Sequence, residues 1–152
     1  MAVEKRVLIP GAGGPGAINM TRSLLSAKEK VFLVGCDASP FYIHLALTHE
    51  KVLVPRASDE DAYINAINEI VVRFNLNFIM PNSSIEMMVL TRNKDRLLAP
   101  MYVPSLKTQE LSADKFACYE RWLERGISVP KSIKIDKPED IERAFDEIKT
   151  RP

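Results

Sequence analysis

The sequence predicts an α/β fold in which an open, mostly parallel β-sheet is covered by helices on both faces. Short apolar runs rich in branched residues recur along the chain, and most lack polar alternation, as expected of strands buried on both faces. Helical patterns with short connections lie between several of these runs, which is the order of a parallel sheet. The predicted strands are residues 7–9, 31–34, 52–54, 78–80 and a run around 101–103.

The clearest helical pattern covers residues 58–75. Its apolar side chains recur at three- and four-residue steps and therefore share one face of a helix. Ser58 is placed to cap the start, since a serine hydroxyl accepts hydrogen bonds from the first turn of a helix. The residues of this apolar face are Tyr63, Ile64, Ile67, Ile70, Val71 and Phe74.

A glycine-rich loop separates the first predicted strand from the helix-like run that follows it. In "VLIPGAGGPGAINMTRSL" the glycines stand at positions 11, 13, 14 and 16, and Gly11, Gly13 and Gly16 form the pattern GxGxxG in the strand-to-helix context that it requires. Such a loop lets an anionic ligand contact backbone N–H groups at the positive end of a helix dipole. The alternative is that these glycines only allow close packing.

Asp37 follows the second predicted strand. Dinucleotide-binding folds place a carboxylate at about this distance from the glycine loop, where it holds the ribose hydroxyl groups. The glycine loop and Asp37 together would therefore favour NAD. The same residue, standing before "ASP", is also well placed simply to make a turn.

A second polar loop, "PNSSIEMMVL", follows the fourth predicted strand at the carboxyl end of the sheet, where open parallel sheets bind their ligands. Ser83 and Glu86 have the spacing of a capping box, in which both side chains only satisfy helix N–H groups. In the functional interpretation, the Glu86 carboxylate holds the ammonium or hydroxyl group of a small substrate.

The pattern changes after Ser105. A polar lead precedes a helix with Phe116, Tyr119 and Leu123 on one face, and Gly126 is well placed to end that helix. A strand-like "SIKI" follows. The last helix has Pro138 in its first turn and an apolar face that must pack on something, so the sequence looks interrupted at its end. The residues of this face are Ile141, Ala144, Phe145 and Ile148.

The stretch "SADKFACYERWLERGISVPKS" carries a family resemblance. Its Asp-Lys pair opening a helix and its Gly-Ile-x-Val-Pro turn resemble the entry into the ATP-grasp fold, as in carbamoyl phosphate synthase large chains and related carboxylate-amine ligases. The earlier pieces "VGCDASP", "KVLVP" and "FIMPNSSIEMMVL" resemble the Rossmann-like domain that precedes ATP-grasp. The resemblance implies a Rossmann-like pre-ATP-grasp domain at 1–105 and the first elements of an incomplete ATP-grasp domain at 106–152.

In such enzymes ATP phosphorylates a carboxylate or bicarbonate, and an amine attacks the acyl phosphate. The resemblance implies that Lys115 contacts ATP, although a solvated lysine in a first helical turn is the plain alternative. It also implies that the glycine loop and Glu86 face the substrate rather than the nucleotide. With Asp37 and Ser83 from the two polar loops, the candidate substrate- or anion-binding residues are Gly11, Gly13, Gly14, Gly16, Asp37, Ser83 and Glu86.

The complete enzyme is expected to use ATP and Mg²⁺, with neither held tightly by this chain alone. The second ATP lysine, the lid and the magnesium carboxylates of the family would follow Pro152, so no catalytic residue or metal ligand is assigned here. The chain alone is expected to be inactive. Its expected partners are a small-molecule substrate and the rest of the ATP-grasp domain, in cis or in another chain, with a homo-oligomer as a further possibility.

Composition limits the other classes of function. There are 21 Lys and Arg against 20 Asp and Glu, a net charge of +1, so the chain lacks the positive excess that drives nonspecific nucleic-acid binding. Cys36 and Cys118 have neither metal-ligand nor disulfide-frame spacing. No apolar run reaches the ~20 residues that span a bilayer. We therefore expect a cytoplasmic protein without nucleic-acid or membrane partners.

Two rival functions remain open at this point. The first is an NAD(P)-binding module of an oxidoreductase, which the glycine loop and Asp37 favour but the Asp114-Lys115 segment does not. The second is a noncatalytic regulatory or assembly domain that docks on a partner through an apolar surface.

Overall fold

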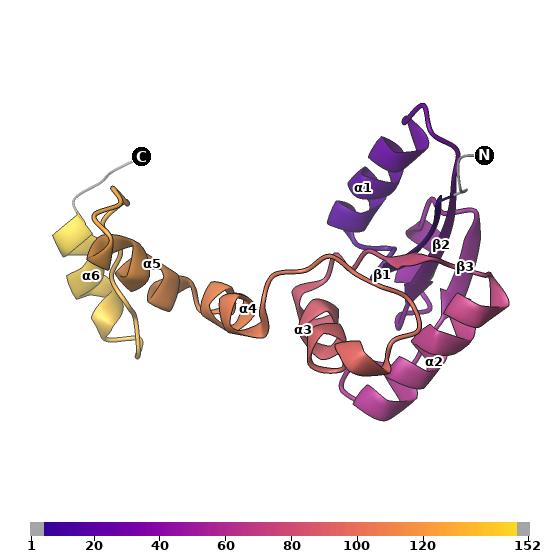
Figure 1. The fold of residues 1–152 in the computed structure, drawn as a ribbon. Helices are drawn as coiled ribbons and strands as arrows, with labels where there is room; N and C mark the ends of the chain where they lie inside the picture. Colours follow the sequence, from indigo (N-terminus) through magenta and orange to yellow (C-terminus); the bar gives the residue numbers. More distant parts are fainter. Residues whose placement is uncertain (1–4, 149–152) are drawn as a thin grey trace. The chain divides into compact units, whose positions relative to one another are not determined.

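A computed structural model of the chain describes residues 5–148. It divides into two compact units, with the boundary between Leu106 and Lys107. The first unit holds a β-sheet with its covering helices, and the second is helical (Figure 1). Within the described residues, no helix has both the length and the apolar character needed to cross a membrane.

The sheet of the first unit is parallel throughout. Its strands are β1 (Lys5–Pro10), β2 (Val31–Asp37), β3 (Glu50–Leu53) and β4 (Phe78–Ile79), in the order β3-β2-β1-β4. The run predicted around 101–103 is not a full strand, because it contributes only a single bridge between Ile79 and Met101.

Helices cover both faces of this sheet (Figure 1). Side chains alternate along a strand, so neighbouring residues of β1 face opposite sides. Leu8 packs in one apolar cluster with residues of α2 (Glu60–Arg73) and α3 (Ser84–Arg92). Ile9 packs in another, with residues of α1 (Pro15–Leu25). The prediction of a Rossmann-like α/β fold is confirmed.

Helix α2 confirms the apolar face predicted from the sequence, because five of its six residues are buried: Tyr63, Ile64, Ile67, Ile70 and Val71. The predicted cap was wrong. Asp59, and not Ser58, precedes the first helical residue, and its Oδ1 accepts a hydrogen bond from the Ala62 N–H at 3.2 Å. Ser58 lies one residue too early to reach the first turn.

Removing this cap is expected to destabilise the first unit modestly. We expect Asp59→Ala to lower its free energy of unfolding by about 1 kcal/mol, since the Ala62 N–H loses its acceptor. Ser58→Ala is the matched control and should change it by less than about 0.5 kcal/mol. Urea unfolding followed by circular dichroism measures both, and equal effects of the two substitutions would contradict the assigned cap.

Short 3₁₀ turns complete the first unit. The turn η1 (Tyr42–Leu45) lies between β2 and β3, and η2 (Lys94–Arg96) follows α3. The backbone of η1 comes very close to the glycine loop, because a Cβ placed on Gly13 would overlap the carbonyl group of Tyr42.

The second unit contains the helices α4 (Leu106–Ala113), α5 (Lys115–Glu124) and α6 (Asp140–Ile148). The first residue of α4, Leu106, still belongs to the first unit. Two sequence predictions were wrong here. The polar lead is the helix α4, since Lys, Gln and Glu form helices well even without an apolar face. The "SIKI" segment is not a strand, because the described part of this unit offers no other strand for it to pair with.

The predicted end of α5 is confirmed. Asp114 caps its start, with Oδ1 accepting from the N–H groups of Phe116 and Ala117 at 2.9 Å each. Gly126 has a φ of +69°, and its N–H donates to the Leu123 carbonyl. A residue with positive φ after the last turn is the usual way to end a helix.

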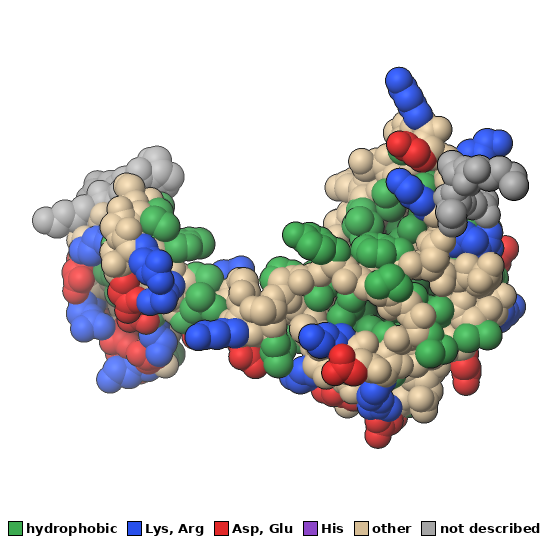
Figure 2. Space-filling view, in the orientation of Figure 1, with side chains coloured by type: hydrophobic (Ala, Val, Ile, Leu, Met, Phe, Trp, Pro, Cys, Tyr) green, Lys and Arg blue, Asp and Glu red, His purple; other side chains and the backbone are tan. Residues whose placement is uncertain are grey.

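Little of the second unit is buried. Gln109 and Ala144 are its buried residues within the three helices. Several large apolar side chains of this unit are exposed: Trp122, Leu123, Ile127, Ile135, Ile141 and Phe145. Figure 2 shows apolar side chains on the surface of this unit among charged ones.

Candidate functional site

A cavity of about 510 Å³ lies beside the glycine loop of the first unit. Its walls come from the segments that follow β1, β2, β3 and β4, and it therefore occupies the edge where parallel sheets bind ligands. Five of the predicted site residues line it: Gly11, Gly14, Asp37, Ser83 and Glu86. The fold thus brings together side chains that are up to 75 positions apart in the sequence.

The N–H groups of the glycine loop are directed to acceptors inside the chain. Ala12 donates to the Cys36 carbonyl and Gly14 to the Gly11 carbonyl, both at 3.0 Å. Gly13 donates to Asp37 Oδ2 at 3.2 Å, and Oε2 of the Glu86 carboxylate lies close to Gly11. The next residue, a proline, has no N–H.

Three of these glycines meet a steric requirement. Gly11 has a φ of +63°, and a Cβ there would lie 2.6 Å from Glu86 Oε2. A Cβ on Gly13 would overlap Tyr42, and one on Gly16 would overlap the side-chain oxygen of Asn82. Close packing therefore accounts for Gly13 and Gly16, which do not line the cavity, and their ligand role stays a prediction.

Asp37 ends β2 and faces the cavity. Its Oδ1 accepts from the Ser39 N–H at 2.9 Å, while Oδ2 accepts from Gly13. The hydrogen bond from the Ser39 N–H closes the turn that the sequence predicted as the alternative to a ligand role for Asp37. The hydrogen bond from Gly13 fixes the carboxylate against the glycine loop, so both oxygens already hold a backbone donor.

Glu86 is 9% exposed, and its Oε1 accepts a hydrogen bond from the Tyr63 hydroxyl at 2.9 Å. Burial raises the pKa of Glu86 above its usual range, and the nearby charge of Asp37 adds to this. Hydrogen bonds from Tyr63, Ser83 and the Gly11 backbone act in the opposite direction on that pKa.

The predicted capping box does not form. Ser83 is the residue that precedes α3, but its side chain makes no cap hydrogen bond to the helix. The Glu86 carboxylate turns instead toward Tyr63 and Gly11. It follows that Glu86 is part of the cavity wall rather than a local helix cap.

Sequence reasoning missed three residues of this site. Tyr63 was assigned to the apolar face of α2, although its hydroxyl was the one polar group on that face and so the available signal. Cys36 is fully buried nearby, and burial raises its pKa. Arg56 lines the cavity, and its guanidinium has no hydrogen-bond or ion-pair partner among residues 5–148.

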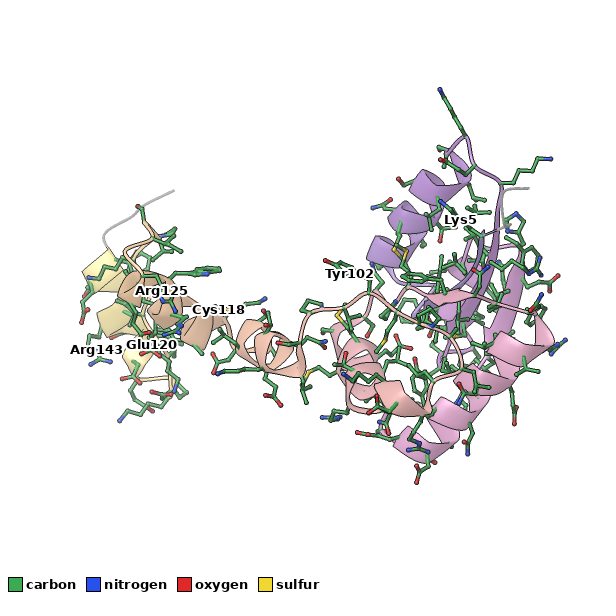
Figure 3. The ribbon with its side chains drawn as sticks, viewed as in Figure 1. Lys5, Tyr102, Cys118, Glu120, Arg125 and Arg143 are labelled. Atoms are coloured by element: carbon green, nitrogen blue, oxygen red, sulfur yellow. The ribbon has the colours of Figure 1, made fainter. Side chains whose placement is uncertain are left out.

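Lys115 belongs to the second unit and is the first residue of α5. Its Nζ donates to the Ser112 carbonyl at 3.4 Å. It lines a separate cavity of about 340 Å³, together with Tyr119 and Trp122. Cys118, labelled in Figure 3, lines the same cavity. Lys115 is therefore placed beside aromatic side chains, and its predicted contact with ATP stays a prediction.

The described residues do not gather a metal-ligand set. Within 5–148, no three His, Cys, Asp or Glu side chains lie close enough together to hold a metal ion.

Comparisons with known proteins identify the fold. No family model matches the sequence, and no curated protein matches it. An L-amino acid ligase from Bacillus licheniformis has a similar structure, with a TM-score of 0.60 and 14% identity over 97% of this chain and 43% of that one. The biotin carboxylase domain of a single-chain bacterial carboxylase has a TM-score of 0.51 and 18% identity over 94% and 34%.

At these identities the likeness shows the fold alone. The chain is built like part of these enzymes. It spans less than half the length of either solved structure. A UDP-D-quinovosamine 4-dehydrogenase from Vibrio fischeri has a TM-score of 0.47, at 15% identity over 88% of this chain and 97% of that one, which is too low to support an argument.

Proposed function

We propose that the chain is the N-terminal part of an ATP-dependent carboxylate-amine ligase. One observation carries this proposal: the similarity to the L-amino acid ligase extends over 97% of the chain and so includes both units. A dinucleotide-binding domain alone would explain the fold of the first unit but not the presence of the second. The similarity to a biotin carboxylase domain and the ATP-grasp-like order of the sequence motifs support the same proposal.

The two units divide the work in this proposal. The cavity of the first unit binds a substrate of the ligase, because it is concave, mostly apolar and supplied with a few fixed polar groups. Lys115 in the second unit binds ATP, where an ammonium group stabilises the negative charge of the phosphates. The bound ATP supplies the phosphoryl group that activates a carboxylate.

Substituting Lys115 tests the nucleotide part of the proposal. In the product of the complete gene, assayed with ATP, Mg²⁺, carboxylates and amines, we expect ADP release that needs both organic substrates. Lys115→Met should raise the KM for ATP by about tenfold, which corresponds to about 1.4 kcal/mol of lost binding.

Lys137→Met is the matched control, since Lys137 is an exposed lysine of the same unit whose side chain has no hydrogen-bond or ion-pair partner among residues 5–148. It should leave the KM for ATP unchanged. An active enzyme whose KM for ATP responds equally to both substitutions would contradict the role of Lys115.

The NAD(P) rival keeps one observation in its favour, the GxGxxG loop followed by Asp37. Against it, the N–H groups of Ala12, Gly13 and Gly14 already have acceptors inside the chain and are not free to bind a pyrophosphate. Titration with NADH, followed by its fluorescence, separates the two functions. Micromolar binding that Asp37→Ala abolishes would favour the oxidoreductase over the ligase.

A further inference from the structure

We infer that the cavity of the first unit binds a free amino acid as a zwitterion, with its ammonium group on Asp37 and Glu86 and its carboxylate on Arg56. The inference rests on the proposed function, because it names the substrate class of the same site. In this arrangement a cationic group of the ligand lies beside the glycine loop, where an anion usually binds.

The chain places its own carboxylates at the anion positions of the glycine loop. Asp37 accepts from the N–H of Gly13, and the Glu86 carboxylate lies against Gly11. The N–H groups of Ala12 and Gly14 are bonded to carbonyl groups. A phosphate or carboxylate arriving at this loop would therefore find the N–H groups of residues 12–14 already bonded and would face two acidic side chains.

The carboxylates of Asp37 and Glu86 can still accept hydrogen bonds from a ligand. A carboxylate has about four lone-pair positions, and an ammonium group has three N–H donors. Asp37 uses two positions, for Gly13 and Ser39, and Glu86 accepts from the Tyr63 hydroxyl while its Oε2 lies close to Gly11. Both therefore keep acceptor capacity while backbone and buried donors hold them in place. A primary ammonium group matches this fixed set of acceptors.

The cavity also has a positively charged side chain in its wall. Arg56 lies beyond β3 and lines the same cavity as Asp37 and Glu86. The backbone before it is tied to β2, since the Val54 N–H donates to the Asp37 carbonyl at 3.0 Å. Its guanidinium has no partner among the described residues, and guanidinium groups bind carboxylates through two parallel hydrogen bonds. Arg56 is therefore a free anchor for a ligand carboxylate.

The remaining walls suit an apolar side chain. Pro15, Tyr42 and Ile85 line the cavity, and Ile85 is 69% exposed in the free protein. A volume of about 510 Å³ lies within the range of small-molecule sites. Apolar L-amino acids thus match the cavity in charge, size and polarity.

Ligand analogues test this inference on the unaltered 152-residue chain. Calorimetric titration with L-leucine, L-methionine and L-phenylalanine should show saturable binding of at least one of them at millimolar concentration or below. For that amino acid, the N-acetyl derivative lacks the ammonium group, and the amide lacks the carboxylate. Each change should weaken binding at least about tenfold, since it removes one charged contact.

Variants assign the two charged contacts. Arg56→Gln should weaken binding of the amino acid about tenfold, because its carboxylate loses the contact with the guanidinium. Binding of the amide should be nearly unchanged, because the amide has no carboxylate that could contact Arg56. Arg22→Gln is the matched control, an exposed arginine of the same unit that does not line the cavity. It should bind both ligands as the unaltered chain does.

Three results would overturn the inference: no binding of any of the three amino acids at about 10 mM, an N-acetyl derivative that binds as well as its parent, or equal effects of Arg56→Gln on amino acid and amide. Failure of the proposed function looks different. If amino acids bind as described but the complete gene product never releases ADP with them, the site stands and the ligase fails.

Discussion

Gly13→Ala is expected to lower the free energy of unfolding of the first unit by about 3 kcal/mol. The added Cβ would overlap the carbonyl group of Tyr42, which is backbone and cannot rotate away. Either the glycine loop or η1 must therefore move. Movement of the loop would also break the hydrogen bond from the Gly13 N–H to Asp37.

The buried thiol of Cys36 provides a measurement specific to this unit. In a Cys118→Ser background, Gly13→Ala should speed labelling of Cys36 about a hundredfold, since each tenfold corresponds to about 1.4 kcal/mol. Gly14→Ala is the neighbouring control, because Gly14 has an ordinary φ of −72° and its added Cβ would lie 3.3 Å from the Gly11 carbonyl. Equal labelling rates in the Gly13→Ala and Gly14→Ala variants would show that the close approach of η1 does not exclude a side chain at position 13.

Glu86→Gln is expected to change how stability depends on pH. Burial raises the pKa of Glu86 in the folded state, so above its ordinary value of 4.5 the folded protein binds more protons at this site than the unfolded one. The stability from this group is complete below that value and is lost as pH rises through the raised pKa. Glutamine does not titrate, so the stability of the variant does not change with pH at this position.

The stability of Glu86→Gln relative to the unaltered chain should therefore rise with pH across this window. The slope approaches about 1.4 kcal/mol per pH unit within the window, and the difference becomes constant above it. Asp37, Cys36 and Tyr63 are the titratable groups that interact with Glu86, and both proteins contain them. To a first approximation their contributions cancel.

Urea unfolding of both proteins from about pH 4 to about pH 9 measures this difference. Tyr63→Phe is a useful third protein, since it removes the hydroxyl that donates to Glu86 Oε1 but leaves the carboxyl group. Its pH dependence should extend to higher pH than that of the unaltered chain. A constant difference between Glu86→Gln and the unaltered chain at all pH values would contradict a raised pKa.

The fold of the first unit was predictable because its pattern is local and strong. The apolar runs around Val7 and Val31 each mark a strand with a buried stretch, and the run around Val52 marks β3, an edge strand in which Val52 is half-buried. The period of 58–75 marks a helix. The pairing of strands was harder to predict from the sequence. Residues near Met101 have the composition of a strand but form one bridge only, which is a tertiary outcome rather than a local one.

The candidate site was predictable only in part. Loops after parallel strands converge at one edge, so Gly11, Asp37 and Glu86 were expected near one another. The sequence does not show where their hydrogen bonds go, and this decides the charge of the ligand. Tyr63 and Arg56 lacked a motif and were visible only once α2 and the loop before it were folded against the sheet.

The single tryptophan of the chain, Trp122, lies half exposed on α5, whereas Cys36 is buried in the sheet of the first unit. Fluorescence during melting therefore reports on one part of the polypeptide, and thiol protection reports on the other. Because little apolar surface is buried around α5, the optical transition should come first and be broad. A single melting temperature would then describe neither process.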